Sequence, residues 1–382
     1  MAPGRLANLS VGFDSHGAER DGEGNATYAR NLVSALLLAS RTDEFVLYAQ
    51  NPDHAFYRSL SGRGLSRVVR TTQWNGFARV VYALGRAASR DCVDVLHVQY
   101  FAPLWFRGPL VVTVHDLAFR SVPETFPPRL RAALRMLVPL SIRRAARVIT
   151  GSEFARRDIL TSYSISPERV TVIPHGVDGR FYPRTDGEST GILARYGLRP
   201  GFLFSVGRLN ERKNITRLLE AYACLRRRGA TLPLVIGGKP DGGVESGQRA
   251  SEATDVRWMG LIPNEDLPAF YSGAAAFIYP SLFEGFGLPV LEAMACGTPV
   301  VTSDRAALPE LATDAALLVD PEDVGALADA MERVLTDTAL AQELRQRGMA
   351  RSQRFTWAET AARTLAIYRE VSRGERGDRH KA

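Results

Sequence analysis

Two glutamates, Glu284 and Glu292, flank a glycine-rich bend in the stretch EGFGLPVLE. A buried strand is expected just before it, and Pro289 suits the first turn of a helix, where a missing N–H costs nothing. A helix start with free N–H groups binds anions, so we expect a diphosphate after Gly287. The two acids would then accept hydrogen bonds from hydroxyls on either side of it. The alternative is an ordinary turn with two solvated acids.

A basic motif, GRLNERKN at residues 207–214, follows another expected strand in the same half of the chain. Gly207 ends that strand, and Arg208 and Lys213 would project beyond it. Arginine suits bidentate phosphate contact and lysine acts as a point charge. Both can stabilise a diphosphate that leaves with growing negative charge. A solvated basic turn is the alternative, but two such motifs after strands of one sheet favour a site.

The elements that must position these motifs alternate between short β-rich runs and amphipathic helical stretches. This alternation predicts parallel sheets and an α/β fold with two doubly wound, Rossmann-like domains facing across a cleft. The proline- and glycine-rich segment 174–183 marks the boundary. We expect domains at 1–175 and 176–355, followed by a helix and a charged tail at 356–382.

Composition narrows the class of protein. The 382-residue chain is 45% hydrophobic but has no apolar run near the ~20 residues that cross a bilayer, and its start lacks the pattern of a secretory signal. Three cysteines form no metal or disulfide pattern, so a cytoplasmic protein is expected. Residues 1–175 hold 22 basic and 14 acidic residues, whereas residues 176–382 hold 26 and 27. This asymmetry indicates either an anionic partner or a compositional preference for arginine.

The stretch EGFGLPVLEAMACGTPV resembles the E-x7-E signature of retaining glycosyltransferases of the GT4 family. The resemblance extends over both halves through GRLNERKN, VHD at 114–116, VIPHGVD at 172–178 and FTWAETAARTLAIY near the end. It implies the GT-B fold, in which the C-terminal domain binds the nucleotide sugar, the N-terminal domain binds the acceptor, and the last helix crosses back to the first domain.

The family resemblance also implies roles for individual residues. Those expected to act on the reacting groups are Arg208, Lys213, Glu284 and His115. Those expected to bind the donor are Gly207, Ile262, Phe286, Gly287, Leu288 and Glu292, with Glu284 and the backbone of 286–288 on the sugar and Glu292 on the ribose. Asp116 would orient its neighbours. Gly22 and Gly24, in a loop that lacks the third glycine of a dinucleotide fingerprint, would contact the acceptor.

The resulting prediction is a retaining transferase that moves a hexosyl unit from GDP-mannose or a UDP-sugar to an acceptor hydroxyl. The acceptor would be lipid-linked, a saccharide or a natural product, and no nucleic-acid partner is expected. Since no Asp-x-Asp occurs, we expect neither a metal nor another cofactor. The alternatives are a phosphorylase on the same fold and a non-catalytic sugar-nucleotide-binding or membrane-associated scaffold.

Peripheral contact with the inner face of a membrane also stays open. The arginine-rich helix expected at 129–144 would either lie on an anionic membrane or pack on its own sheet with a basic outer face.

Overall fold

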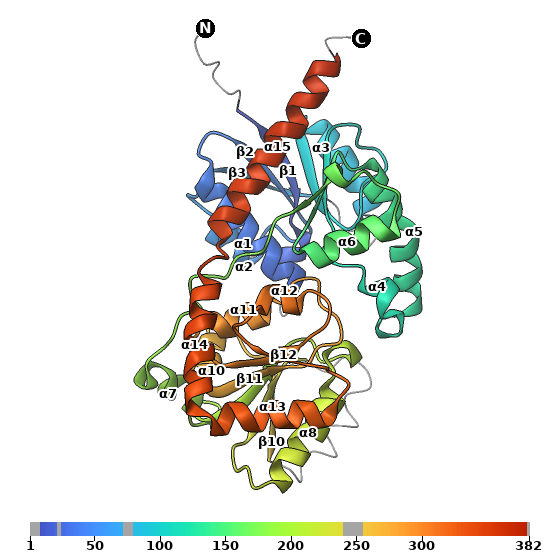
Figure 1. Ribbon diagram of the computed structural model, residues 1–382. Coiled ribbons are helices and arrows are strands. Elements are labelled where there is room, and N and C mark those ends of the chain that lie inside the picture. Colours follow the sequence, from blue (N-terminus) through green and yellow to red (C-terminus); the bar gives the residue numbers. More distant parts are fainter. Residues whose placement is uncertain (1–7, 21–23, 72–78, 240–254, 380–382) are drawn as a thin grey trace.

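The computed structural model describes residues 8–20, 24–71, 79–239 and 255–379. It contains two parallel β-sheets, one above the other (Figure 1). The first sheet has the order β3-β2-β1-β4-β5-β6-β7. Its strands are β1 (Ser10–Asp14), β2 (Glu44–Ala49), β3 (Leu65–Arg70), β4 (Val95–Gln99), β5 (Leu110–Thr113), β6 (Arg147–Thr150) and β7 (Val170–Val172). Every recorded pairing in it is parallel, as βαβ crossovers require.

The second sheet repeats the same doubly wound order, β10-β9-β8-β11-β12-β13. Its strands are β8 (Phe202–Val206), β9 (Leu234–Gly237), β10 (Val256–Gly260), β11 (Ala274–Tyr279), β12 (Val300–Ser303) and β13 (Leu317–Val319). Central strands such as β5 are buried along their whole length, because helices cover both faces of the sheet. The predicted fold class, two Rossmann-like α/β units, is confirmed.

Helices alternate with these strands along the chain. On the first sheet they are α1 (Gly24–Ala39), α2 (Ala55–Ser59), α3 (Gly85–Arg90), α4 (Ala118–Ser121), α5 (Pro128–Arg144) and α6 (Glu153–Ser162). With the second sheet come α7 (Asp186–Ala194), α8 (Ile215–Arg227), α10 (Leu267–Gly273), α11 (Leu288–Ala295), α12 (Leu308–Ala312), α13 (Val324–Thr336) and α14 (Thr338–Ser352).

Strand β3 and helix α7 are among the elements that were not predicted. Strand β3 is the edge of its sheet and is mostly exposed, so it lacks a hydrophobic pattern. Helix α7 has a weak pattern, but its start carries a capping box, in which Thr185 and Glu188 exchange side-chain and backbone hydrogen bonds. The T-x-x-E spacing could have revealed it.

The last helix, α15 (Trp357–Arg379), leaves the second sheet and packs along the first, where Figure 1 shows it in red. Trp357, Leu365 and Tyr368 lie in the same buried cluster as α1 and β1. The Tyr368 hydroxyl is 2.5 Å from Nδ1 of the buried His97 on β4. Where the chain crosses, Val177 N donates to Phe355 O over 3.0 Å.

Candidate active site

The two charged motifs meet at the carboxyl ends of β8 and β11. These strands are neighbours although they are not consecutive, so the crevice beyond them is the topological switch point where open α/β sheets bind ligands. Gly207–Lys213 follows β8, and the loop to α11 follows β11. The Nζ of Lys213 lies 2.5 Å from Oε1 of Glu284, so two residues predicted separately form one ion pair.

Glu284 is buried, and three neighbouring side chains donate hydrogen bonds to its carboxylate. Its Oε1 accepts hydrogen bonds from Tyr279 Oη at 2.9 Å and Ser281 Oγ at 2.7 Å, as well as the Lys213 ammonium. Burial alone would raise the pKa of Glu284, but Lys213 and Arg212 outweigh it and lower that pKa to about 2. The carboxylate is therefore ionised at neutral pH and fixed in direction.

Lys213 is enclosed by the same groups. Its ammonium lies 4.8 Å from the centroid of the Tyr279 ring and hydrogen-bonds the Tyr279 hydroxyl. Burial lowers the pKa of Lys213, while Glu284 opposes that shift. Gly207, at φ 151°, packs against the lysine side chain, and a Cβ there would lie 3.4 Å from Lys213 Cε.

Arg212 is a third cation that the sequence analysis missed. Its guanidinium lies 3.6 Å from Oδ2 of Asp116, which follows β5 of the other sheet. Burial would lower the pKa of Arg212, but Glu284 and Asp116 raise it above its usual range. Its main-chain oxygen also accepts hydrogen bonds from Leu282 N and Ser281 Oγ. Its place beside Lys213 in the motif was the available signal.

The loop that holds Glu284 also bridges the two domains. Ser152 Oγ, at the start of α6, donates to Gly285 O over 2.7 Å. The carboxylate of Glu310 on α12 accepts the N–H groups of Glu153 and Phe154 at 2.9 and 3.0 Å. The Glu284 loop and α12 therefore contact the start of α6 directly.

His115 follows β5 and lies at the boundary between the domains, but its ring is already engaged. Nε2 lies 2.8 Å from Gln99 Oε1, so this nitrogen carries the proton, and Nδ1 is left to accept from His175 Nε2 at 3.4 Å. Burial lowers the pKa of His115 to about 4, so the ring is neutral at pH 7. Gln99 and His175 are further residues that the sequence analysis did not single out.

Glu292 lies on α11. Tyr271 Oη donates to its Oε2 at 2.9 Å. Burial, assisted by Asp178, raises the pKa of Glu292 to about 8, so this carboxyl is largely protonated at neutral pH. The two glutamates of the bend thus sit in opposite electrostatic environments.

The other predicted donor residues surround the bend. Gly287 caps α11 at φ 108°, a conformation that favours glycine, and Leu288 is the first residue of the helix. The Phe286 ring packs on His175 and Phe355, at centroid distances of 4.8 and 5.9 Å, so only its backbone faces the bend.

Three more predicted residues lie near the ends of strands or helices. Arg208 is exposed directly after Gly207. Ile262 follows β10, but its side chain is buried in the hydrophobic core of the second sheet. Gly24 begins α1 with open space around it, whereas Gly22 lies outside the described residues.

A buried ion pair lies at the end of the first strand. Asp14 is the last residue of β1, and its carboxylate accepts two hydrogen bonds from the buried Arg79, at 3.0 and 3.2 Å. Burial would raise the pKa of Asp14, but Arg79 and His16 outweigh it and hold it well below its usual range. This bidentate pair occupies the first sheet's own carboxyl edge.

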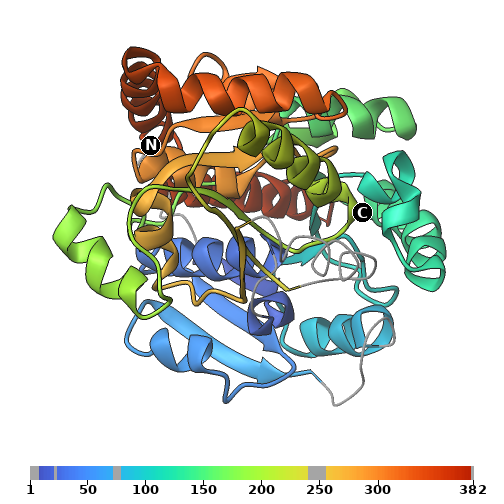
Figure 2. The ribbon, with the colours of Figure 1, turned by 90° about the horizontal axis from the view of Figure 1, so that it is seen from below.

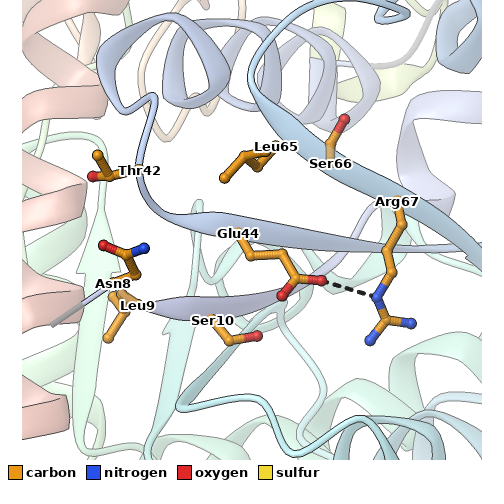
Figure 3. Close-up of a pocket in the computed structure, with 8 residues that line it drawn as sticks. All are labelled: Asn8, Leu9, Ser10, Thr42, Glu44, Leu65, Ser66 and Arg67. Atoms are coloured by element: carbon orange, nitrogen blue, oxygen red, sulfur yellow. Dashed lines mark hydrogen bonds and ion pairs between the residues drawn. The ribbon is translucent and has the colours of Figure 1, made fainter.

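A pocket of about 400 Å³ opens at the opposite edge of the first sheet (Figure 3). Ser10, Glu44 and Leu65, the first residues of β1, β2 and β3, line it, so it is unrelated to the switch-point site. A second hollow, of about 430 Å³, is lined by residues of α6, including Phe154 and Asp158. The Phe154 ring lies 5.6 Å from that of Phe283, next to Glu284.

Within the described residues, no helix combines the length and apolarity that a membrane span requires. In the same part of the chain, no group of three or more His, Cys, Asp or Glu side chains is arranged to hold a metal ion.

Comparison with solved structures defines the class of fold. Sucrose-phosphate synthase from Thermosynechococcus elongatus superposes with a TM-score of 0.76 at 23% identity, covering 95% of this chain and 99% of that one. Anabaena HepE in complex with UDP and glucose superposes with a TM-score of 0.72 at 20% identity, covering 94% and 99%. The architecture is the GT-B fold.

Sequence comparison then gives the family. The family model for glycosyltransferase family 4 matches residues 23–180, and that for glycosyl transferases group 1 matches residues 196–351. O-antigen chain mannosyltransferase B of Escherichia coli is 32% identical over 265 residues, which cover 68% of this chain and 70% of that protein. The chain therefore belongs to glycosyltransferase family 4.

Proposed function

We propose that this glycosyltransferase moves a hexosyl unit from a nucleotide-diphosphate sugar to an acceptor hydroxyl, with retention of the anomeric configuration and without a metal ion. The observation that supports it most is the buried cluster of Lys213, Arg212 and Glu284 at the switch point. Two cations beside a helix start can neutralise a leaving diphosphate, and a fixed carboxylate can accept hydrogen bonds from sugar hydroxyls.

The proposed roles combine the family resemblance with the contacts of the site. Arg208, Lys213 and the start of α11 bind the diphosphate. Glu284 is aligned by Tyr279 and Ser281 to receive the sugar. The acceptor approaches from the α6 side, where the hollow beside Phe154 borders the Glu284 loop. Closed domains exclude water and so limit hydrolysis of the donor.

Mannose is the first sugar to test, because the E. coli relative is named a mannosyltransferase. GDP-mannose, the donor expected from the sequence, is therefore the first donor to try. A UDP-sugar is the second, because UDP and glucose are bound in the HepE structure. The acceptor is a lipid-linked sugar, a saccharide or a natural product.

Thermal shift against UDP, GDP, ADP, TDP and their sugar conjugates, with and without EDTA, tests the donor site. A ligand that binds only the native state raises its apparent stability. One nucleotide should give a shift that EDTA does not change and that Arg208→Ala abolishes, while Arg63→Ala, an exposed arginine of the first domain, leaves it intact. No shift with any nucleotide would favour a non-catalytic scaffold.

Product analysis separates the remaining alternatives. A retaining transferase releases a nucleoside diphosphate and keeps the donor's anomeric configuration, which NMR of the product reads directly. Release of a sugar phosphate in the presence of inorganic phosphate would identify a phosphorylase instead.

A further inference from the structure

Large exposed apolar side chains gather on one face of the first domain. They come from the π-helix η2 (Arg79–Leu84), the loop after β4, and α5. We call this set the α5 face; its apolar members and their exposures are Tyr82 (43%), Leu104 (47%), Trp105 (56%), Met136 (63%) and Leu140 (43%).

Backbone and side-chain hydrogen bonds join the three segments into one surface. Leu104 N donates to Val81 O at 3.0 Å, which ties the loop to η2. Arg144, at the end of α5, donates to Phe106 O at 2.8 Å, and Ser141 Oγ accepts from Ala102 N at 2.8 Å. The loop that presents Trp105 is therefore held between two helices and keeps its ring outside the core.

Helix α5 carries apolar residues on its outer face as well as on the face that packs against the sheet. Leu134, Val138 and Ile142 face the sheet and are buried. Met136 and Leu140, four residues apart, point outward together. The helix therefore packs on its own sheet, and its outer face carries apolar residues beside the expected arginines.

The charged residues of the segments that form this face are all basic. Neither residues 128–144 nor the loop at 100–109 contains an aspartate or glutamate. Arg129 and Arg143 are exposed towards the two ends of α5, and the described structure records no ion pair for either. Both views place α5 at the outer margin of the molecule (Figures 1 and 2).

We propose that the α5 face docks onto the surface of an anionic lipid bilayer. Trp105, Leu104 and Met136 enter the interfacial region, where tryptophan is favoured, and Arg129 and Arg143 contact acidic headgroups. An anionic bilayer fits this face because its interior accommodates the apolar centre while its acidic headgroups contact the basic rim. This inference concerns docking alone and does not depend on the proposed transfer reaction.

Flotation with vesicles tests it without any donor or acceptor. The full chain should bind vesicles of equal parts phosphatidylglycerol and phosphatidylcholine at low salt. It should bind vesicles of pure phosphatidylcholine much more weakly. Trp105→Ser with Met136→Ser should weaken binding by about tenfold or more. Each of Arg129→Gln and Arg143→Gln should weaken it by about fivefold at low salt and by less at high salt.

Matched controls keep the test specific. Leu38→Ser changes an equally exposed leucine (67% exposed) on α1, and Arg63→Gln removes an exposed arginine elsewhere; neither should alter vesicle binding. Trp105→Phe should keep binding but remove most of the blue shift in tryptophan fluorescence that vesicles cause.

Three results would overturn the proposal. They are equal binding to both kinds of vesicle, binding unaffected by the α5-face substitutions, and a dimer in sedimentation that Trp105→Ser dissociates. The last result would make this face a self-association surface. Circular dichroism and nucleotide thermal shift verify that each variant is folded.

Discussion

Gly285 lies against the main-chain carbonyl of His115 so closely that a Cβ on the glycine would be 2.2 Å from that oxygen. His115 follows β5 of the first sheet and Gly285 lies in the loop after β11 of the second sheet. The contact therefore limits how closely the two domains approach at the site. It also places Glu284, the preceding residue, directly at the boundary. A side chain at position 285 has no room unless the domains move apart.

Gly285→Ala should therefore hold the domains open and reduce transfer. Small misplacements of reacting groups cost about 10²-fold in rate, and we expect a loss of that order. Small-angle scattering should report a larger radius of gyration. Gly179→Ala is the matched control, because a Cβ there meets nothing within 4 Å. Unchanged rate and unchanged radius in the Gly285 variant would refute the role of this contact.

Substitutions of Lys213 and Glu284 should differ in how they affect the rate of transfer and the stability of the protein. Lys213→Ala removes a cation from the proposed diphosphate site, and we expect kcat to fall by about 10²–10³-fold. Glu284→Gln leaves the buried Lys213 without its carboxylate partner, so it should cost stability as well, about 3–5 kcal/mol. Steady-state rates and urea denaturation measure the two effects. A Glu284→Gln protein of undiminished stability would show that the pair is weakly coupled.

The raised pKa of Glu292 predicts an unusual pH dependence of stability. Its folded pKa of about 8 lies above the ordinary 4.5, so between these values the folded state binds more protons than the unfolded state. The contribution of Glu292 to the free energy of unfolding is complete below pH 4.5 and is lost as the pH rises through 8.

Glu292→Gln removes this dependence and should raise the melting temperature relative to the wild type at pH 9 more than at pH 5. Calorimetry across this range measures the difference. Glu265→Gln, at an exposed glutamate, is the control and should show a flat difference. A flat difference for Glu292→Gln too would mean that this carboxyl titrates normally.

The bond between Tyr368 and His97 should stabilise the return of α15 to the first domain. Tyr368→Phe leaves the buried Nδ1 of His97 without its partner, which costs about 1–3 kcal/mol of unfolding free energy. Urea denaturation measures the loss. Tyr182→Phe, at a tyrosine that is 46% exposed, should change nothing; an equal effect of both substitutions would argue against the bond.

Much of the fold and part of the candidate site could be predicted from local sequence. The alternation of strands and helices could be predicted, because elements such as β2, β6, β8 and α11 are short buried runs between clear stop signals. The meeting of Lys213 with Glu284 followed from motifs that directly succeed strands. Residue type and spacing were sufficient there, since the ends of neighbouring parallel strands meet at one edge of a sheet.

Only the tertiary structure decided what those residues face. Glu284 and Glu292 are eight positions apart and identical in type, yet one is held ionised by Lys213 and Arg212 and the other is held protonated by burial. Arg212 joins Asp116 across 96 residues of sequence, and His115 receives its partners from β4 and the interdomain segment. Charge state and partner choice depend on dielectric surroundings and on contacts between distant segments, which packing creates and local sequence does not contain.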